Sequence, residues 1–237
     1  MKKIRKWLFC VLIFLFVLIL GFFCWNIWQD FQDKQISDAQ IKIKPEVSDM
    51  DSLSIMDFSN IQAQNPDIAA WLTIQQIGID YPIVQATDNK YYLDHTAQCR
   101  YNKLGSLFLD YRVNNDFSDF NSVIYGHNMT SGQMFGQLER MKEQTYFDTV
   151  TTGVLYTPGK TYRLKIFAVS VAGSESDYYR YAFPSNADKE EHLNMIGKYA
   201  KFHRDVGVKA NDRLLLLSTC SYEYKNARTL VIAKLCD

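Results

Sequence analysis

The most pronounced hydrophobic feature of the chain is an uncharged run from Trp7 to Gln29, preceded by four basic residues. About 20 helical residues span the hydrocarbon core of a bilayer, so this run predicts a transmembrane helix. Trp25 and Trp28 near its far end resemble an interfacial aromatic belt, and the basic cluster predicts a cytoplasmic N-terminus. An uncleaved signal anchor is favoured. The alternative is a cleaved signal peptide, whose apolar region would be shorter and would end in an A-x-A-like site.

Hydropathy divides the remainder into a polar segment and a folded domain. Residues 30–54 have alternating charges, one proline and no sustained apolar period, which predicts a tether or a loose helix outside the core. Order is expected to begin near Ile55. The predicted organisation is a cytoplasmic basic tail (1–6), a transmembrane signal anchor (7–29), an extracytoplasmic linker (30–54) and a folded domain (55–237).

Beyond residue 55 the apolar runs are short and bounded by turn residues, a pattern typical of β-strands. Pro82 lies near the start of the first strand, which indicates an edge strand. Pro158-Gly159 separates two later strands and predicts a hairpin. The expected strands are Tyr81–Val84, Ser106–Leu109, Asn121–Tyr125, Gly153–Tyr156, Tyr162–Val171, Leu214–Leu217 and Ala227–Ala233.

Helical periodicity is limited to three segments. Asp57–Ile61 predicts a short helix that stops before Pro66. Gly132–Met141 places its apolar residues on one helical face. Asp188–Arg204 has acidic residues near its start and basic residues near its end, both favourable to a helix dipole. The predicted fold class is therefore mainly β, with one helix inserted before the leucine-rich strand.

Composition and charge narrow the range of functions. The 237 residues are 47% hydrophobic and 14% aromatic, enough for one core, and the net formal charge is zero. The charge gives no electrostatic argument for nucleic-acid binding. Five cysteines, two of them in the apolar leader, have no regular spacing and predict no disulfide framework. Neither CxxC nor HExxH occurs, so no metal site is expected.

Cys220 is the strongest candidate nucleophile. The run Leu214–Leu217 predicts a buried strand that delivers Ser218, Thr219 and Cys220 to its end. A hairpin would then place Arg228, at the start of the next strand, beside the sulfur. A neighbouring positive charge favours the thiolate. Arg228 could also stabilise an oxyanion, and its structural alternative is a surface salt bridge with Glu223.

A reactive thiol requires a base, and His127 is the best placed of the four histidines. It follows a predicted strand and comes directly after Gly126, where the backbone can turn sharply. An imidazole there could exchange a proton with the thiol and later protonate a leaving amine. The weaker candidates are two cysteines and three histidines, of which the last two are expected on the solvated flank of the inserted helix: Cys99, Cys236, His95, His192 and His203.

Taken together, these segments resemble the sortases, the cysteine transpeptidases of Gram-positive cell surfaces. The resemblance rests on Leu217-Ser218-Thr219-Cys220 with Arg228 downstream, and on Ile124-Tyr125-Gly126-His127-Asn128-Met129 upstream. Class B is the closer match, because of Asn65-Pro66-Asp67, Ile79–Gln85, Tyr91-Tyr92-Leu93, Met134–Leu138 and the long insertion before the cysteine strand. The similarity extends from about residue 55 to the C-terminus.

The resemblance implies an eight-stranded sortase-type β-barrel with short N-terminal helices and a helix-bearing insertion. It implies that Cys220 is the nucleophile, His127 the acid/base and Arg228 the oxyanion-stabilising or substrate-positioning cation. The residues implied to contact the sorting peptide are Ser218, Thr219, Leu93, Tyr178 and Tyr179. The cysteine-to-arginine interval is shorter than in some class B members, and Ser221 replaces an acidic residue found in others.

The implied reaction is cleavage of an Asn-Pro-x-Thr-x-like sorting signal after threonine, followed by transfer of the surface protein to a peptidoglycan-precursor amine. It requires no cofactor. The implied partners are the sorting-signal peptide, a lipid-linked wall precursor and the membrane. The implied location is the cell membrane, single-pass, with the catalytic domain outside the cytoplasm. Two alternatives remain: a secreted cysteine peptidase or peptidoglycan hydrolase, and a non-catalytic wall-binding β-domain.

Overall fold

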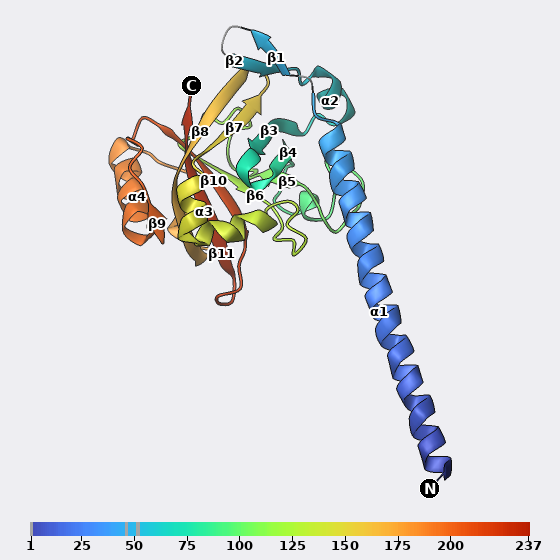
Figure 1. The fold of residues 1–237 in the computed structure, drawn as a ribbon. Coiled ribbons are helices and arrows are strands. Elements are labelled where there is room, and N and C mark those ends of the chain that lie inside the picture. Colours follow the sequence, from blue (N-terminus) through green and yellow to red (C-terminus); the bar gives the residue numbers. More distant parts are fainter. Residues whose placement is uncertain (1, 46, 51–52) are drawn as a thin grey trace. The chain divides into compact units, whose positions relative to one another are not determined.

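A long N-terminal helix and a folded domain make up the chain. The computed structural model describes residues 2–45, 47–50 and 53–237, in two units, residues 1–38 and 39–237. The first unit consists of helix α1 (Lys2–Lys42) up to Asp38, and the last turn of this helix belongs to the second unit (Figure 1). Its segment Phe9–Ile36 is long and apolar enough to cross a membrane. The helix continues past Gln29, so the first part of the predicted linker takes its helical alternative.

The end of the predicted linker contacts the folded domain. Strands β1 (Val47–Met50) and β2 (Leu53–Met56) pair antiparallel, so strand structure begins before residue 55. Residues 46, 51 and 52 of the predicted linker lie outside the described residues. Lys44 Nζ donates to Asp80 Oδ1 at 2.7 Å, and Asp80 also accepts from Trp71 Nε1 at 2.7 Å.

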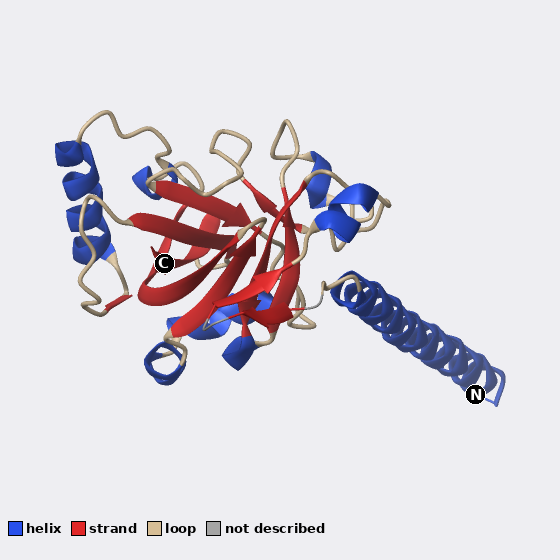
Figure 2. Cartoon of the chain, turned by 90° about the horizontal axis from the view of Figure 1, so that it is seen from above, coloured by secondary structure: helices blue, strands red, loops and turns tan. Residues whose placement is uncertain are grey.

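Eight strands close a β-barrel, which confirms the predicted fold class. Their order is β11-β10-β6-β5-β4-β3-β7-β8, and β8 pairs with β11 to complete the circle (Figure 2). Strand β9 (Phe202–His203) extends the sheet from β8. The barrel strands are β3 (Ile68–Ile74), β4 (Ile79–Val84), β5 (Leu107–Leu109), β6 (Asn121–Tyr125), β7 (Thr152–Thr157), β8 (Lys160–Gly173), β10 (Arg213–Cys220) and β11 (Ala227–Cys236).

The predicted hairpin around Pro158-Gly159 is confirmed by the pairing of β7 with β8. The predicted edge position of the strand containing Pro82 is wrong, because β4 pairs with β3 on one side and β5 on the other. The parallel pairing with β5 begins only at Ile83. Pro82, which has no N–H to donate, is therefore tolerated inside the barrel.

Short helices cover the barrel. The helix predicted before Pro66 is confirmed as α2, but Gly132–Met141 is not one α-helix. Gly132 and Met134 have φ of +81° and +53°, which a right-handed helix cannot continue, and 3-10 helix η3 starts only at Gly136. The remaining elements are α2 (Ser59–Gln64), α3 (Gln144–Thr149) and 3-10 helices η1 (Gln75–Ile77), η2 (Tyr91–Leu93), η3 (Gly136–Lys142) and η4 (Asp177–Tyr179).

The inserted helix α4 (Asn186–Tyr199) is shorter than predicted. It begins at a capping box, in which Ser185 and Asp188 satisfy each other's backbone N–H groups. The chain then turns into β9, so His203 lies on a strand. His192 is only 3% exposed and packs against Phe183, so its predicted solvated position is wrong. The α4 periodicity did not show which flank would face the barrel.

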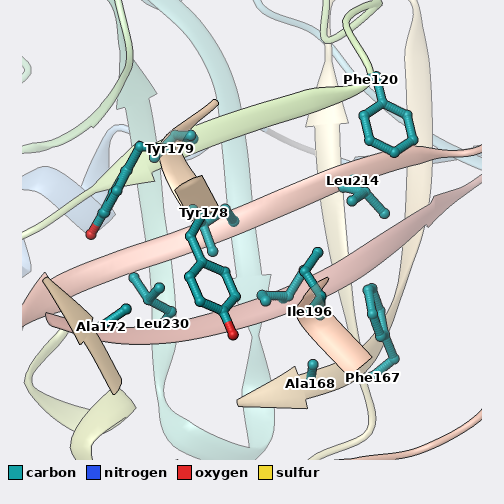
Figure 3. Close-up of a cluster of buried hydrophobic side chains, with 12 residues drawn as sticks. Phe120, Phe167, Ala168, Ala172, Tyr178, Tyr179, Ile196, Leu214 and Leu230 are labelled. Atoms are coloured by element: carbon teal, nitrogen blue, oxygen red, sulfur yellow. The ribbon is translucent and has the colours of Figure 1, made fainter. Parts of the chain in front are cut away.

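A hydrophobic cluster fixes the insertion to the barrel beside the cysteine strand. Ile196 from α4 and Tyr178 from η4 pack with Leu230 of β11 and Phe167 of β8 (Figure 3). All four side chains are buried. The insertion is therefore anchored next to the ends of β10 and β11, and its first residues border the site that those ends form.

Candidate active site

Cys220 lies at the end of β10, where an apolar strand gives way to polar residues. The four leucines that precede Ser218 are buried, whereas Cys220 is partly exposed. The antiparallel register pairs Cys220 directly with Arg228, the second residue of β11. Directly opposed residues of an antiparallel pair project from the same face. The hairpin predicted from sequence therefore brings the thiol and the guanidinium together.

His127 comes from the segment that follows β6, which runs parallel to β10. The register aligns Tyr125 with Ser218, so the chain leaves β6 beside the end of the cysteine strand. Two hydrogen bonds join the segments: the Gly126 N–H donates to the Ser218 carbonyl at 3.1 Å, and the Thr219 hydroxyl donates to the Gly126 carbonyl at 2.8 Å. Thr219 thus orients the histidine segment.

The residues on either side of His127 fix its backbone. A Cβ on Gly126 would lie 2.4 Å from Leu107 Cδ2 and 2.7 Å from a Phe135 ring carbon, so only glycine fits. Asn128 Nδ2 donates to the Cys220 carbonyl at 2.8 Å. Asn128 thus holds the backbone of the cysteine. The sequence motif did not indicate this role, because the contact joins positions 92 residues apart.

The His127 ring is held by a main-chain carbonyl. Nε2 lies 2.7 Å from the Leu93 oxygen. Because a carbonyl can only accept, Nε2 carries a proton, and in the neutral ring Nδ1 is the nitrogen that accepts. Within the part of the chain described, no hydrogen bond joins the imidazole to the Cys220 thiol. Leu93 contributes its backbone to the histidine and its 42%-exposed side chain to the pocket.

A pocket of about 310 Å³ brings seven of the eight predicted site residues together. Two hollows of about 540 Å³ have linings without cysteine: one lies between α4 and residues 208–211, and the other adjoins the pocket and shares Tyr125, Ser174 and Tyr179 with it. The predicted residues that line the pocket are Cys220, His127, Arg228, Ser218, Thr219, Leu93 and Tyr179; the others are Asn89, Phe108, Tyr125, Gly126 and Ser174.

The two tyrosines predicted to contact peptide have different surroundings (Figure 3). The Tyr179 hydroxyl pairs with Ser218 Oγ at 2.7 Å, and its ring lines the pocket. Burial raises the pKa of Tyr179 to about 12, so the phenol stays neutral. The Tyr178 ring points into the hydrophobic cluster and its hydroxyl pairs with Ser170 at 2.8 Å. Tyr178 lies outside the pocket, so its expected peptide contact has no support from its position.

Comparison with known proteins identifies the family to which the chain belongs. Residues 72–236 match the family described as Sortase domain. The chain belongs to the sortase family. Sortase B from Listeria monocytogenes is 37% identical over 179 residues, which cover 74% of this chain and 72% of the relative. The predicted class B resemblance is confirmed. Sortases are cysteine transpeptidases, so the predicted enzyme class is confirmed as well.

Solved sortase B structures share the barrel. The Clostridium perfringens structure aligns with a TM-score of 0.72 at 34% identity and covers 76% of this chain and all of its own. A Staphylococcus aureus sortase B–substrate complex aligns with a TM-score of 0.72 at 26% identity, covering 76% of this chain and 84% of its own. The site described here is therefore carried by a sortase-type barrel.

Arg228 of this sortase is available to a substrate. Its Nη1 donates to the Ala227 carbonyl at 3.0 Å, and among the described residues no carboxylate forms a salt bridge with it. The alternative partner Glu223 is bound instead by Lys142 at 2.5 Å. A guanidinium that has only one backbone contact keeps most of its donors for an incoming oxyanion.

The far wall of the sortase pocket is fixed by an ion pair between the buried Asp110 and the exposed Arg112. Tyr125 donates its hydroxyl to Asp110 at 2.8 Å, and Arg112 binds the same carboxylate at 2.6 Å. Burial alone would raise the pKa of Asp110, but hydrogen bonds from Arg112 and Tyr125 outweigh it and hold the pKa below its usual value. The Tyr125 ring stacks on Tyr179 at 6.0 Å. No local sequence pattern predicts this support, because it joins the loop after β5, which carries Asp110 and Arg112, to Tyr125 at the end of β6.

The weaker candidates lie outside the sortase pocket. His95 stacks on Tyr91 and contacts Asp94 Oδ1 at 2.8 Å. Cys99 is exposed in a loop, and Cys236 is in the last rungs of β11. Among the described residues, no group of three or more His, Cys, Asp or Glu side chains is arranged to hold a metal ion.

Proposed function

We propose that this sortase cleaves a C-terminal sorting signal of a surface protein and joins the protein to an amine of a peptidoglycan precursor. The single observation that carries the proposal is the convergence of Cys220, His127 and Arg228 on one pocket. They come from three strand ends and supply a nucleophile, an acid/base and a fixed cation. This is the minimum set for acyl transfer through a thioester.

In the first step the Cys220 thiolate attacks the carbonyl carbon of the threonine in an Asn-Pro-x-Thr-x-like signal. The oxyanion that forms accepts hydrogen bonds from the Arg228 guanidinium, which stabilises the tetrahedral intermediate. The C–N bond to the next residue then breaks. The leaving amine takes its proton from His127, and the surface protein remains bound to Cys220 as a thioester.

In the second step an acceptor amine attacks the thioester carbonyl. His127 accepts the proton of the attacking nitrogen, the C–S bond breaks and Cys220 is released as thiolate. The product contains a new amide bond, so no metal, nucleotide or redox partner is required. A lipid-linked wall precursor is the acceptor class proposed, because the enzyme carries a helix able to reach the same membrane.

The pocket lining is consistent with an extended peptide. Leu93, Phe108 and Tyr179 provide apolar walls, while Ser174 and Asn89 provide polar groups. The Staphylococcus aureus relative has been solved as a complex with its substrate. We therefore assign peptide contacts to Ser218, Thr219, Leu93 and Tyr179, and none to Tyr178.

The proposed location is the cell membrane, with a single crossing. Residues 1–6 form a basic cytoplasmic tail, residues 7–29 the anchor, and residues 30–54 an extracytoplasmic linker whose last part packs on the catalytic domain of residues 55–237. The charges before Trp7 support this orientation, since cytoplasmic flanks are enriched in Lys and Arg. Both proposed substrates are present at the outer face.

Substitution Cys220→Ala tests the assignment. The wild-type enzyme, incubated with an Asn-Pro-x-Thr-x peptide and a glycine-type amine, should yield the amide-linked product by mass spectrometry. The Cys220→Ala enzyme should yield no product, whereas Cys236→Ala should retain activity. Hydrolysis without any amine adduct would indicate a peptidase or hydrolase. Wild-type turnover by Cys220→Ala would eliminate the thioester mechanism.

A further inference from the structure

The loop that joins the two active-site strand ends is unusually exposed. The last rung of the β10–β11 ladder pairs Cys220 with Arg228, so the loop begins directly at the reacting groups. Its residues 222–226 are exposed, and Asn226 has a φ of +62°. Three backbone hydrogen bonds involve this loop: the Ser221 N–H donates to the Ala227 carbonyl at 2.9 Å, the Ala227 N–H to the Tyr224 carbonyl at 3.1 Å, and the Ser174 N–H to the Asn226 carbonyl at 3.1 Å.

A single lysine holds this loop against the neighbouring helix. Lys142, the last residue of η3, donates Nζ to Glu139 at 2.6 Å, to Glu223 of the loop at 2.5 Å and to Ser221 Oγ at 3.1 Å. Its side chain is only 17% exposed. Hydrogen bonds from Lys142 and Ser221 lower the pKa of Glu223 to about 2, so the carboxylate is charged at neutral pH.

Two buried hydroxyls extend the contact to the residues next to the reacting groups. Thr229 follows Arg228, is fully buried, and donates its hydroxyl to Glu139, while Ser221 Oγ lies 3.1 Å from the same oxygen. Ser221 follows Cys220 and donates to Glu223. Because side chains alternate along a strand, Thr229 faces away from Arg228 and the pocket. The network therefore contacts the face of the β10–β11 hairpin that is opposite Arg228.

The same network reaches the histidine segment. The Phe135 N–H donates to the His127 carbonyl at 3.0 Å, and η3 begins at the next residue. One short element thus connects the His127 backbone at its start with Lys142 at its end.

We propose that Lys142, with Glu139 and Glu223 as its partners, is the positioning group that sets the Cys220–Arg228 hairpin against His127. Both carboxylates bind the same ammonium nitrogen. Removal of the lysine would leave two carboxylates without the cation that they share, and like charges in proximity disfavour the charged form of each. The loop would move away from η3, and the sulfur would lose its alignment with both partners. The proposal rests on the sortase reaction above.

The test compares Lys142→Met with Lys234→Met in the full-length enzyme in detergent. Lys234 lies on β11 and binds Asp212 at 2.7 Å with the same 17% exposure, at the end remote from the pocket. Lys142→Met should lower kcat about tenfold with KM changed less than twofold, since small misplacements of reacting groups are costly and the peptide walls are untouched. Lys142→Arg should recover part of the loss, and Lys234→Met should resemble wild type.

Alkylation of Cys220 by iodoacetamide at pH 7, followed by mass spectrometry of its peptide, supplies a readout independent of transpeptidation. The rate should fall in Lys142→Met, because the displaced hairpin would no longer hold the sulfur opposite the Arg228 guanidinium. Unchanged kcat and alkylation would overturn the proposal. If Lys142→Met does not fold, Glu223→Gln should show a smaller fall of both rates, and wild-type rates there would overturn it equally. Loss of transpeptidation in the wild type would instead contradict the proposed function and leave the alkylation comparison decisive.

Discussion

Arg228 illustrates how much of the proposed chemistry depends on the shape of one side chain. It faces Cys220 across the last rung of the β10–β11 ladder and is not neutralised by a carboxylate in the described part of the chain. A guanidinium presents several donors in a rigid plane, whereas an ammonium is a compact point charge. Charge alone would therefore not reproduce its function at an oxyanion.

The corresponding prediction is that Arg228→Lys lowers kcat/KM about 100-fold for an Asn-Pro-x-Thr-x peptide, the cost typical of losing one oxyanion donor. Product formation followed by mass spectrometry measures it. Arg163→Lys, an exposed arginine on β8, is the matched control and should be silent. Activity within threefold of wild type would reduce Arg228 to a structural residue.

At this scale the proposed reacting groups were predictable from the sequence, but the residues that support them were not. Cys220 and Arg228 follow from strand patterns, and His127 from its position after a strand. Asn128 and Asp110 each lie in a loop and bind the end of a strand distant from them in the sequence, which no local pattern encodes. Tyr178 and Tyr179 are neighbours in a one-turn helix, and sequence could not tell which ring would face the pocket and which the core.

His192 on the inserted helix α4 makes the stability of the folded domain depend on pH. His192 on α4 is buried between Phe120 and Phe183. Burial, assisted by the charge of Arg180, lowers its pKa from 6.5 to about 4. The unfolded state therefore binds a proton at pH values where the folded state does not. The contribution of His192 to the free energy of unfolding is fully present above pH 6.5 and is lost progressively as the pH falls toward 4.

We expect the free energy of unfolding to fall by about 2 kcal/mol between pH 7 and pH 4.5 because of His192. Urea denaturation of wild type and His192→Leu at both pH values isolates this contribution, since other titrating groups are common to the two proteins. His203→Leu, an exposed histidine on β9, should retain the wild-type pH dependence. Equal pH dependence in His192→Leu and wild type would contradict the assignment.

The elements themselves were predictable where period and turn chemistry agreed. The β7–β8 hairpin followed from alternation around Pro158-Gly159, and the leucine run gave β10. The helix predicted to start at Gly132 does not form before η3. Its apolar spacing fits a helix, but Gly132 and Met134 adopt positive φ. The edge assignment of β4 failed because sequence does not show how far a neighbouring strand extends beside Pro82.

In the whole molecule, the folded domain begins earlier in the sequence than the hydropathy pattern indicates. Composition places the start of order near Ile55, yet the folded unit begins at Ala39. Ile43 packs against the cluster that contains Trp71, and Lys44 binds Asp80. Isolated apolar or charged residues in a polar segment are invisible to a hydropathy window. Their role emerges only when the barrel supplies the partner surface.

A soluble fragment of residues 39–237 should consequently be more stable than one of residues 55–237. The shorter fragment loses the Ile43 packing, the Lys44–Asp80 contact and strand β1, and it leaves Trp71 partly uncovered. Loss of about 2 kcal/mol in a domain of this size corresponds to a melting temperature lower by roughly 4–8 °C. Lys44→Met in the longer fragment separates the ionic contribution, which should be the smaller part because the pair is partly exposed. Equal melting temperatures for the two fragments would show that residues 39–54 act only as a tether.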